Sequence, residues 1–213
     1  EEAGLPDADE SALTYALRAQ RAWLAWPRYT EDALRDWSTR SSRATLTGDR
    51  KAIDEVAQDF DRTVMRVMED LRAGSETAHD PTSRLLRERI GGVPLTDGEI
   101  VSILRNWTVG ELGTMAASVG ILVDYLSRRP QLQRSLRSTP EDLPAAIDEI
   151  LRLHAPLVSN RRVTTRQVGL AGRTIPAGEP IALVYASANR DEEVFEEAES
   201  FRLDRPNLRD SLA

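Results

Sequence analysis

Hydrophobic residues are densest between residues 97 and 129, the longest apolar stretch of the chain, which ends at Pro130. Apolar positions there follow helical spacing over most of the circumference, and Thr96 with Glu99 supplies a capping box at the start. A continuous helix of this length would measure roughly 50 Å at about 1.5 Å per residue. Because a helix that is apolar on nearly all sides is normally buried, we predict a central helix that crosses a whole domain.

The remaining pattern is mainly helical as well. Apolar positions at helical spacing, separated by turns rich in glycine, proline and aspartate, predict helices at about residues 11–26, 30–46, 51–72, 82–90, 131–136 and 139–154. Short runs of β-favouring residues then alternate with glycine and proline, at residues 163–165, 168–170, 173–175 and 180–185. We therefore predict a mainly α fold with a small β-sheet near the C-terminus.

Three glycines, Gly110, Gly113 and Gly120, interrupt the long apolar stretch. Each costs about 1 kcal/mol relative to alanine inside a helix, so their presence calls for an explanation. One interpretation is close packing against another helix, and the other is a groove for a ligand, bordered by the polar residues Glu111 and Thr114. The residues alone leave both interpretations open.

The composition excludes several classes of function. A net charge of −7 over 213 residues argues against a general nucleic-acid-binding surface. The absence of cysteine excludes disulfides, thiolate metal ligands and a cysteine nucleophile within these residues. The two histidines, His79 and His154, lie far apart without clustered ligands, so we predict no metal site in this chain. Neither of the common glycine-rich phosphate-binding motifs occurs.

The start of the chain and its strongest apolar window indicate the cellular context. No signal peptide precedes the charged first residues, and the window from Met115 to Val123 is too short to span a membrane. We therefore expect a cytoplasmic protein with no membrane partner. The chain also lacks an initiator methionine, so we expect it to be a portion of a longer protein.

Glu149 and Arg152 lie three residues apart on a predicted helix, where two such side chains can meet. Taken alone, they are typical of a solvated surface ion pair. Their context changes this interpretation, because residues 149–152 match the ExxR motif of cytochrome P450 monooxygenases. The apolar helix at 97–129 resembles the family's I helix and ends shortly before the motif, as it does in the family.

Segments downstream of the motif resemble the family's small sheet and the meander that follows it. They are Arg161-Arg162-Val163, residues 169–180 (GLAGRTIPAGEP), residues 188–191 (ANRD) with Val194-Phe195, and residues 200–205 (SFRLDR). The resemblance implies that residues 1–213 form part of a P450 domain. Residues 1–160 would be mostly helical, 161–185 a small β-sheet and 186–213 a meander-like tail.

The resemblance also implies roles for charged residues. Glu149 and Arg152 would be buried structural partners, with Arg205 as the third member of their network. Arg162 falls where the family places an arginine that binds a haem propionate, a role that suits a fixed guanidinium charge.

Along the apolar helix, the resemblance implies a kink where dioxygen binds. Thr114 takes the family's threonine position, but Gly113 stands where an acid usually precedes it, and the nearest acid is Glu111. We expect Thr114, with Glu111 or water, to deliver protons to dioxygen, and Gly110 and Gly113 to border the haem. The substrate pocket would be lined by Asn106, Trp107, Val109, Leu157 and Val158.

The family's haem is held by a cysteine thiolate in a loop after the meander, and these residues contain no cysteine. We expect the parent protein to be a soluble monooxygenase that binds haem b and oxidises a small organic substrate with O₂. Its electrons would come from a redox partner, a ferredoxin or a reductase. This chain alone is expected to be inactive and not to bind haem stably. The alternative is a haem-less P450-like auxiliary protein that partners another enzyme, such as a glycosyltransferase.

Overall fold

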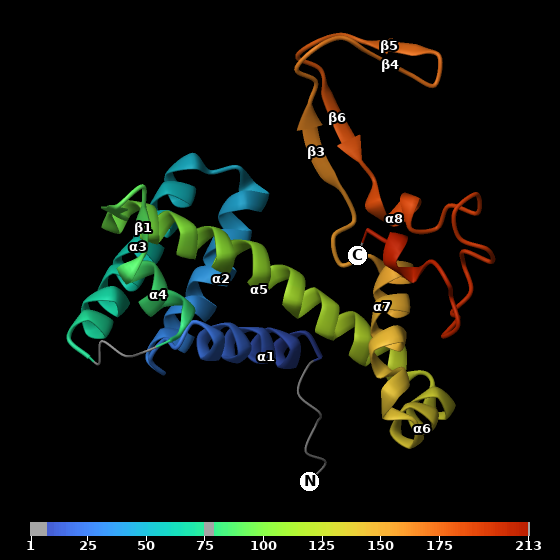
Figure 1. The fold of residues 1–213 in the computed structure, drawn as a ribbon, viewed down its shortest axis with the longest axis horizontal. Helices are drawn as coiled ribbons and strands as arrows, with labels where there is room; N and C mark the ends of the chain where they lie inside the picture. The colour runs from blue at the N-terminus through green and yellow to red at the C-terminus, as the bar shows by residue number, and fades with distance from the viewer. Residues whose placement is uncertain (1–7, 75–78, 213) are drawn as a thin grey trace. The chain divides into compact units, whose positions relative to one another are not determined.

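The computed structural model describes residues 8–74 and 79–212 (Figure 1). The chain divides into two compact units, Glu1–Ala116 and Ala117–Ala213, and the long helix α5 (Asp97–Ser127) contributes to both. The described residues are mainly helical with small antiparallel sheets, as predicted. The assignment of residues 1–213 to one partial domain stays a prediction.

Four helices precede α5 in the described part of the first unit, close to their predicted positions. They are α1 (Ala8–Trp23), α2 (Thr30–Thr47), α3 (Arg50–Arg72) and α4 (Pro81–Arg87). Asp49 begins α3 as an N-cap, because its carboxylate accepts a hydrogen bond from the backbone N–H of Ala52 at 3.1 Å. Asp80 caps α4 in the same way, and Gly48 ends α2 in the left-handed conformation at φ 66°.

The short helix that was predicted to reach residue 90 ends earlier, at Arg87. The next residues form the strand β1 (Arg89–Ile90), which pairs antiparallel with β2 (Val93–Pro94). Gly91 and Gly92 make the turn with φ angles of 59° and 84°, which residues with a side chain rarely adopt. The glycines that we interpreted as a simple break therefore form a hairpin turn.

Apolar side chains of α1, α2, α3 and α5 make the core of the first unit. Leu17, Leu34, Phe60 and Leu104, one from each helix, are almost completely buried in a single cluster. Trp37 packs on Phe60 with ring centroids 5.0 Å apart. This core holds the N-terminal part of α5 against the shorter helices.

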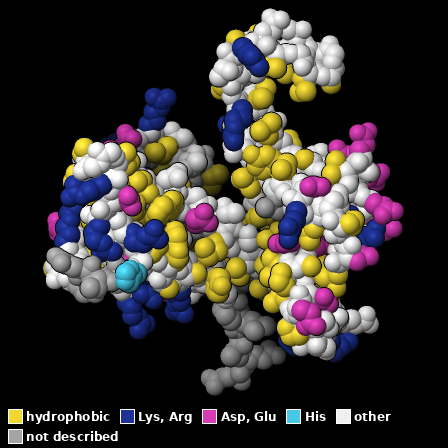
Figure 2. Space-filling model, in the orientation of Figure 1, with side chains coloured by type: hydrophobic (Ala, Val, Ile, Leu, Met, Phe, Trp, Pro, Cys, Tyr) yellow, Lys and Arg dark blue, Asp and Glu magenta, His cyan; other side chains and the backbone are white. Residues whose placement is uncertain are grey.

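The helix α5 confirms the predicted long helix but not its predicted burial. Its start is capped as expected, since Glu99 Oε2 accepts a hydrogen bond from the backbone N–H of Thr96 at 2.8 Å. Leu112 packs into the core, whereas Val109 and Val123 are 50% and 49% exposed. Hydrophobic side chains accordingly reach the molecular surface (Figure 2). The prediction failed because, among the described residues, packing partners cover only one face of α5.

The same helix is long and apolar enough to cross a membrane, judged by length and composition alone. The prediction of no such helix rested on the shorter window from Met115 to Val123 and was too restrictive. The core helix of a soluble protein passes the same test, so this property does not assign α5 to a membrane.

The second unit continues from the end of α5 through α6 (Pro130–Ser138) and α7 (Leu143–His154). A 3₁₀ turn, η1 (Pro140–Asp142), separates the two helices, and Pro144 follows in the first turn of α7, where a missing N–H needs no partner. Within the described part of residues 184–212, the only helical elements are α8 (Tyr185–Ala188) and η2 (Leu208–Asp210). The C-terminal segment is therefore mostly irregular.

The predicted small sheet is two separate antiparallel pairs. The strand β3 (Asn160–Val163) pairs with β6 (Pro180–Leu183), and β4 (Val168–Leu170) pairs with β5 (Arg173–Ile175). Figure 1 shows the β4–β5 hairpin at the far end of the β3–β6 ribbon. Within that ribbon, Arg162 lies opposite Ile181.

The glycine at position 110 gives a direct test of how closely the described chain packs on α5. A Cβ atom there would meet no described atom within 4 Å, so Gly110→Ala should raise the free energy of unfolding by about 0.5 to 1 kcal/mol. Gly48→Ala is the matched control in the same unit, because the left-handed φ of 66° should make it destabilising. Urea denaturation followed by circular dichroism measures both, and a loss of stability for Gly110→Ala would show that something packs closely there.

Candidate functional site

The charged side chains that are buried in the described chain meet in one network, formed by Glu149, Arg152 and Arg205. Arg152 donates to both carboxylate oxygens of Glu149, from Nε at 2.8 Å and from Nη2 at 2.9 Å. Arg205 donates to the same two oxygens from its Nε, at 2.9 and 3.0 Å. One carboxylate from α7 therefore joins two guanidinium groups that are 53 positions apart in the chain, at 152 and 205.

The remaining guanidinium donors bind the irregular C-terminal segment. Nη1 of Arg152 donates to the carbonyl oxygens of Asn189 and Ala198, at 2.5 and 2.8 Å. Arg205 donates to the carbonyl oxygens of Glu196 at 2.7 Å and Ser200 at 3.0 Å. Buried charges are tolerated when their hydrogen bonds are satisfied, and here they also fix a backbone that lacks regular structure.

The surroundings keep Glu149 ionised. Burial raises the pKa of this carboxyl group, but hydrogen bonds from Arg152 and Arg205 outweigh that effect and hold the pKa below its ordinary value. The backbone N–H of Arg202 adds a further hydrogen bond at 3.1 Å. Phe195 covers the network, with its ring 5.1 Å from the guanidinium carbon of Arg152. Because the side chains of Glu149 and Arg152 have no exposed surface, this arrangement suits a structural role and leaves no access for a substrate.

The residues predicted to line an oxygen-binding groove share the open face of α5. Asn106, Gly110 and Thr114 lie on the side away from the buried Leu112, since successive residues turn by about 100° around the helix. Gly113 is exposed and lies at the edge of this face, about 100° from Leu112. The Thr114 hydroxyl donates to the carbonyl oxygen of Gly110 at 2.9 Å.

Glu111 is exposed, one turn before Thr114. A carboxylate and a hydroxyl at this spacing can both approach a ligand on the same side of the helix.

Other predicted site residues lie elsewhere. Trp107 packs on Trp23 of α1, with ring centroids 5.5 Å apart, and is partly buried against the core of the first unit. Its place in the substrate pocket stays a prediction. Leu157, Val158 and Arg162 are exposed in the second unit, and Arg162 donates from Nη1 to the carbonyl oxygen of Arg161 at 2.8 Å. The structure therefore brings together the predicted residues of α5 but leaves their relation to Leu157, Val158 and Arg162 as a prediction.

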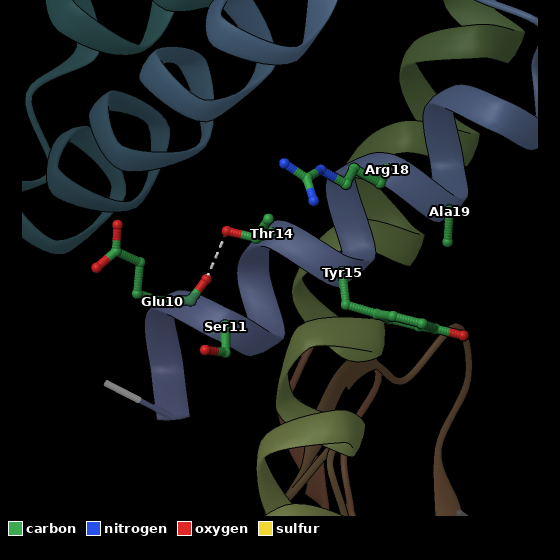
Figure 3. A pocket seen from close by; sticks show the side chains of 6 residues that line it. All are labelled: Glu10, Ser11, Thr14, Tyr15, Arg18 and Ala19. Carbon is green, nitrogen blue, oxygen red and sulfur yellow. Dashed lines mark hydrogen bonds between the residues drawn. The ribbon is translucent and has the colours of Figure 1, made fainter. Parts of the chain in front are cut away.

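The hollow of about 720 Å³ along α1 does not coincide with any predicted site. Figure 3 shows its six lining residues, Glu10, Ser11, Thr14, Tyr15, Arg18 and Ala19. Thr14 donates to the carbonyl oxygen of Glu10 at 2.8 Å, and Arg18 pairs with Glu31 at 3.0 Å. Because every lining residue comes from one helix, this is the surface of α1 and lacks the convergent groups of a binding site.

A second hollow, of about 450 Å³, lies between α2 and α5. Its α5 side includes Val109 and Gly113, which the sequence placed at the substrate pocket and the haem. Its α2 side is formed by residues that the sequence analysis missed: Trp37, Ser38, Ser41, Ser42, Thr45 and Leu46. The signal that could have found them is the helical spacing of the four hydroxyl residues along one stripe of α2.

The chain resembles known proteins in sequence. Residues 142–211, which contain the whole buried network, match the protein-family model described as Cytochrome P450. The chain is 37% identical over 123 residues to Cytochrome P450 130 of Mycobacterium tuberculosis, a match that covers 57% of this chain and 30% of that protein. It is 30% identical over 190 residues to cyclomarin C epoxidase CymV of Salinispora arenicola, covering 85% of this chain and 47% of that protein.

The fold is similar to solved structures as well. The ligand-free structure of cytochrome P450 TbtJ1 matches with a TM-score of 0.82 and 26% identity, covering 95% of this chain and 56% of that chain. Cytochrome P450 CYP101C1 matches with a TM-score of 0.76 and 30% identity, covering 93% and 48%. The chain thus spans about half the length of these relatives.

The buried network predicts a large and pH-dependent effect of Glu149→Gln. Loss of the carboxylate leaves two buried guanidinium groups without a counter-charge, which should lower the free energy of unfolding by about 3 to 5 kcal/mol. Asp124→Asn removes a carboxylate from the exposed pair with Arg128 and should cost about 0 to 1 kcal/mol. Equal losses in urea denaturation would contradict the structural role of the network.

The pH dependence has a defined sign. The pKa of Glu149 is lower in the folded chain, so its ionised form adds stability above its ordinary value of 4.5 and loses this contribution as the pH falls through the lowered pKa. Acidification should therefore destabilise the wild-type chain more steeply than Glu149→Gln. Parallel curves for the two proteins would argue against this assignment.

Proposed function

Because this chain belongs to the cytochrome P450 family, we propose that it is a portion of a haem monooxygenase that inserts oxygen from O₂ into a small organic molecule. The observation that best supports a cofactor here is the bare face of α5. At both Gly110 and Gly113, a Cβ would meet no described atom within 4 Å. No described segment therefore packs closely on either glycine, and of the two interpretations that the sequence left open we propose the ligand groove.

The cofactor that we propose for the longer protein is haem b, a planar and anionic group. Gly110 and Gly113 would border its ring, and the exposed Arg162 on β3 would bind a propionate, since a guanidinium pairs well with a carboxylate. When bound, haem would supply the redox-active iron for oxygenation. Asn106 and Val109 of α5, with Leu157 and Val158 of the second unit, would line the substrate side.

Thr114 is the proposed proton-delivering residue of this chain. Its hydroxyl is held by the carbonyl oxygen of Gly110, which orients its lone pairs away from the helix axis. Glu111 is exposed one turn before Thr114. Its carboxyl group would return a proton to the Thr114 hydroxyl, directly or through water. This pairing replaces the adjacent acid and threonine of the family pattern.

The axial ligand would have to come from residues outside this sequence, because none of the 213 residues is cysteine. We accordingly propose that this chain alone does not bind haem stably and is inactive. The longer protein would take electrons from a ferredoxin or a reductase in the cytoplasm, with no nucleic-acid or membrane partner. The relative named for the epoxidation of cyclomarin C supports an organic substrate.

The second candidate is a haem-less auxiliary protein that binds another enzyme such as a glycosyltransferase, and the missing cysteine would favour it only if no cysteine follows position 213. The two candidates differ in the residues that follow position 213. A glycine-rich loop with a cysteine there supports the monooxygenase, and its absence supports the auxiliary protein.

The optical spectrum separates the two candidates. The reduced, carbon monoxide-treated chain of 213 residues should lack the red-shifted Soret band that a thiolate ligand produces, because it contains no cysteine. The longer natural polypeptide should show this band. A band from the 213 residues, or none from a haem-loaded longer protein, would refute the proposal.

In the longer protein, Thr114→Ala should uncouple oxygen consumption from product formation, because the proton path to dioxygen is interrupted. Thr114→Ser keeps the hydroxyl and should remain largely coupled. Ser102→Ala, at an exposed position of the same helix, is the matched control and should have no effect. The ratio of product formed to oxygen consumed measures coupling, and an unchanged ratio in Thr114→Ala would remove Thr114 from the mechanism.

A further inference from the structure

Asn189 is a buried polar residue that the proposed function does not use. It is 0% exposed and lies at the C-terminal end of α8. Its backbone N–H donates to the carbonyl oxygen of Tyr185 at 2.9 Å, and its own carbonyl oxygen accepts from Nη1 of Arg152 at 2.5 Å. The next residue, Arg190, donates from Nε to the carbonyl oxygen of Leu153 at 3.0 Å. Two successive residues therefore hold this point of the chain against α7.

The two polar atoms of the Asn189 side chain are in different situations. Oδ1 accepts a hydrogen bond from the backbone N–H of Leu212 at 2.7 Å. Nδ2 is buried and has no hydrogen-bond partner among the described residues. Because a backbone N–H can bond only to the oxygen of an amide side chain, this contact fixes which atom is Oδ1 and which is Nδ2. The Asn189 side chain therefore buries a donor that has no acceptor.

An unpaired buried donor is unusual in a folded protein. Burial removes the hydrogen bonds that water would supply, so nearly all buried polar groups have another partner. The other described side chains with a buried, unpartnered nitrogen or oxygen, Gln20, Arg21 and Thr108, lie in the first unit. Within the described part of the second unit, Asn189 is the one case.

The position of Asn189 indicates where its acceptor comes from. Both α8 and η2 lie against α7, and Figure 1 shows α8 beside the end of that helix. Leu212 follows η2 closely and is bound to the Asn189 side chain through its own N–H. An asparagine amide presents a donor and an acceptor side by side, as a peptide group does, so it can bond to two nearby backbone groups of one segment. The residues after Leu212 are the ones that this contact brings to Nδ2.

We propose that Asn189 is a positioning residue for the loop that carries the axial ligand in the longer protein. Nδ2 donates to a backbone carbonyl oxygen within the residues that follow position 213, while Oδ1 holds Leu212. This inference rests on the proposed function and adds to it the residue that directs the ligand loop. Since Arg152 binds the backbone of Asn189, the loop starts from the buried charged network, a rigid part of the second unit.

The expected consequence concerns ligation more than folding. A ligating group must be held within about 0.5 Å of its working position. Without the Nδ2 hydrogen bond, the start of the loop samples other positions, and the cysteine is correctly placed in fewer molecules. The 213 residues themselves should fold as before, because Nδ2 bonds to no described residue within them.

Asn189→Asp is the diagnostic variant, because it removes the donor while keeping an oxygen for Leu212 and nearly the same shape. The buried network holds two guanidinium groups for one carboxylate, so a second carboxylate beside Arg152 has a counter-charge. In the reduced, carbon monoxide-treated longer protein, the ratio of the red-shifted to the unshifted Soret band should fall about threefold or more, as expected for one lost hydrogen bond. The urea midpoint of the 213-residue chain should stay unchanged.

Hydrogen exchange followed by mass spectrometry reports on the segment itself and does not depend on haem. In the longer protein, Asn189→Asp should speed amide exchange after position 213 about threefold or more, while the Leu212 amide stays protected by the remaining oxygen. Asn189→Leu removes both polar atoms and should expose the Leu212 amide as well. Unchanged exchange after position 213 in Asn189→Asp, or an equal increase throughout the second unit, would overturn the proposal.

Asn207→Asp is the matched control. Nδ2 of Asn207 donates to the carbonyl oxygen of Val194 at 2.7 Å in the same C-terminal segment, at an exposed site. This variant loses the same kind of donor and should change neither the Soret ratio nor the exchange after position 213. Effects equal to those of Asn189→Asp would refute a specific role for Asn189.

The failures of the two proposals are distinguishable. If the longer protein with the native Asn189 lacks the thiolate Soret band, the proposed monooxygenase fails, and hydrogen exchange still decides whether Asn189 holds the chain after position 213. If that protein shows the band and Asn189→Asp shows the same band ratio, only the role of Asn189 is refuted.

Discussion

The second unit depends on one buried carboxylate. Glu149 projects from α7 and holds two guanidinium groups, and these groups in turn bind backbone carbonyls of the segment after α8. That segment lacks the ladders of hydrogen bonds that helices and sheets supply, so charge-assisted bonds to Arg152 and Arg205 replace them. The arrangement is stable only as a whole, because each charge in it is buried and would be costly without the others.

The helix α5 is the second organising element, and its two faces serve different purposes. Leu104 and Leu112 anchor one face in the core of the first unit, while Gly110 and Gly113 leave the other face bare. A glycine inside a helix lowers stability, and no described atom packs closely enough on Gly110 or Gly113 to offset that cost. The proposed cofactor groove uses this space.

The hollow between α2 and α5 combines side chains of two helices. Its α2 side includes the hydroxyl groups of Ser38, Ser41, Ser42 and Thr45. Four hydroxyl groups on one helix are unremarkable in sequence, since serine and threonine are common on exposed helix faces. Opposite an apolar wall that contains a glycine, they become one side of a hollow with divided polarity. The packing of Trp107 on Trp23 likewise depends on where α1 lies, which the sequence did not specify.

The sequence by itself determined the features that depend on near neighbours in the chain. Helical spacing located the helices, and Thr96 with Glu99 located the start of α5, because capping involves residues three positions apart. Only the tertiary structure decided what α5 packs against and that Gly91 and Gly92 turn a hairpin. These outcomes depend on contacts between segments far apart in the chain, and local periodicity carries no information about such contacts. The ExxR motif anticipated a network, but the number and length of its hydrogen bonds came from the folded chain alone.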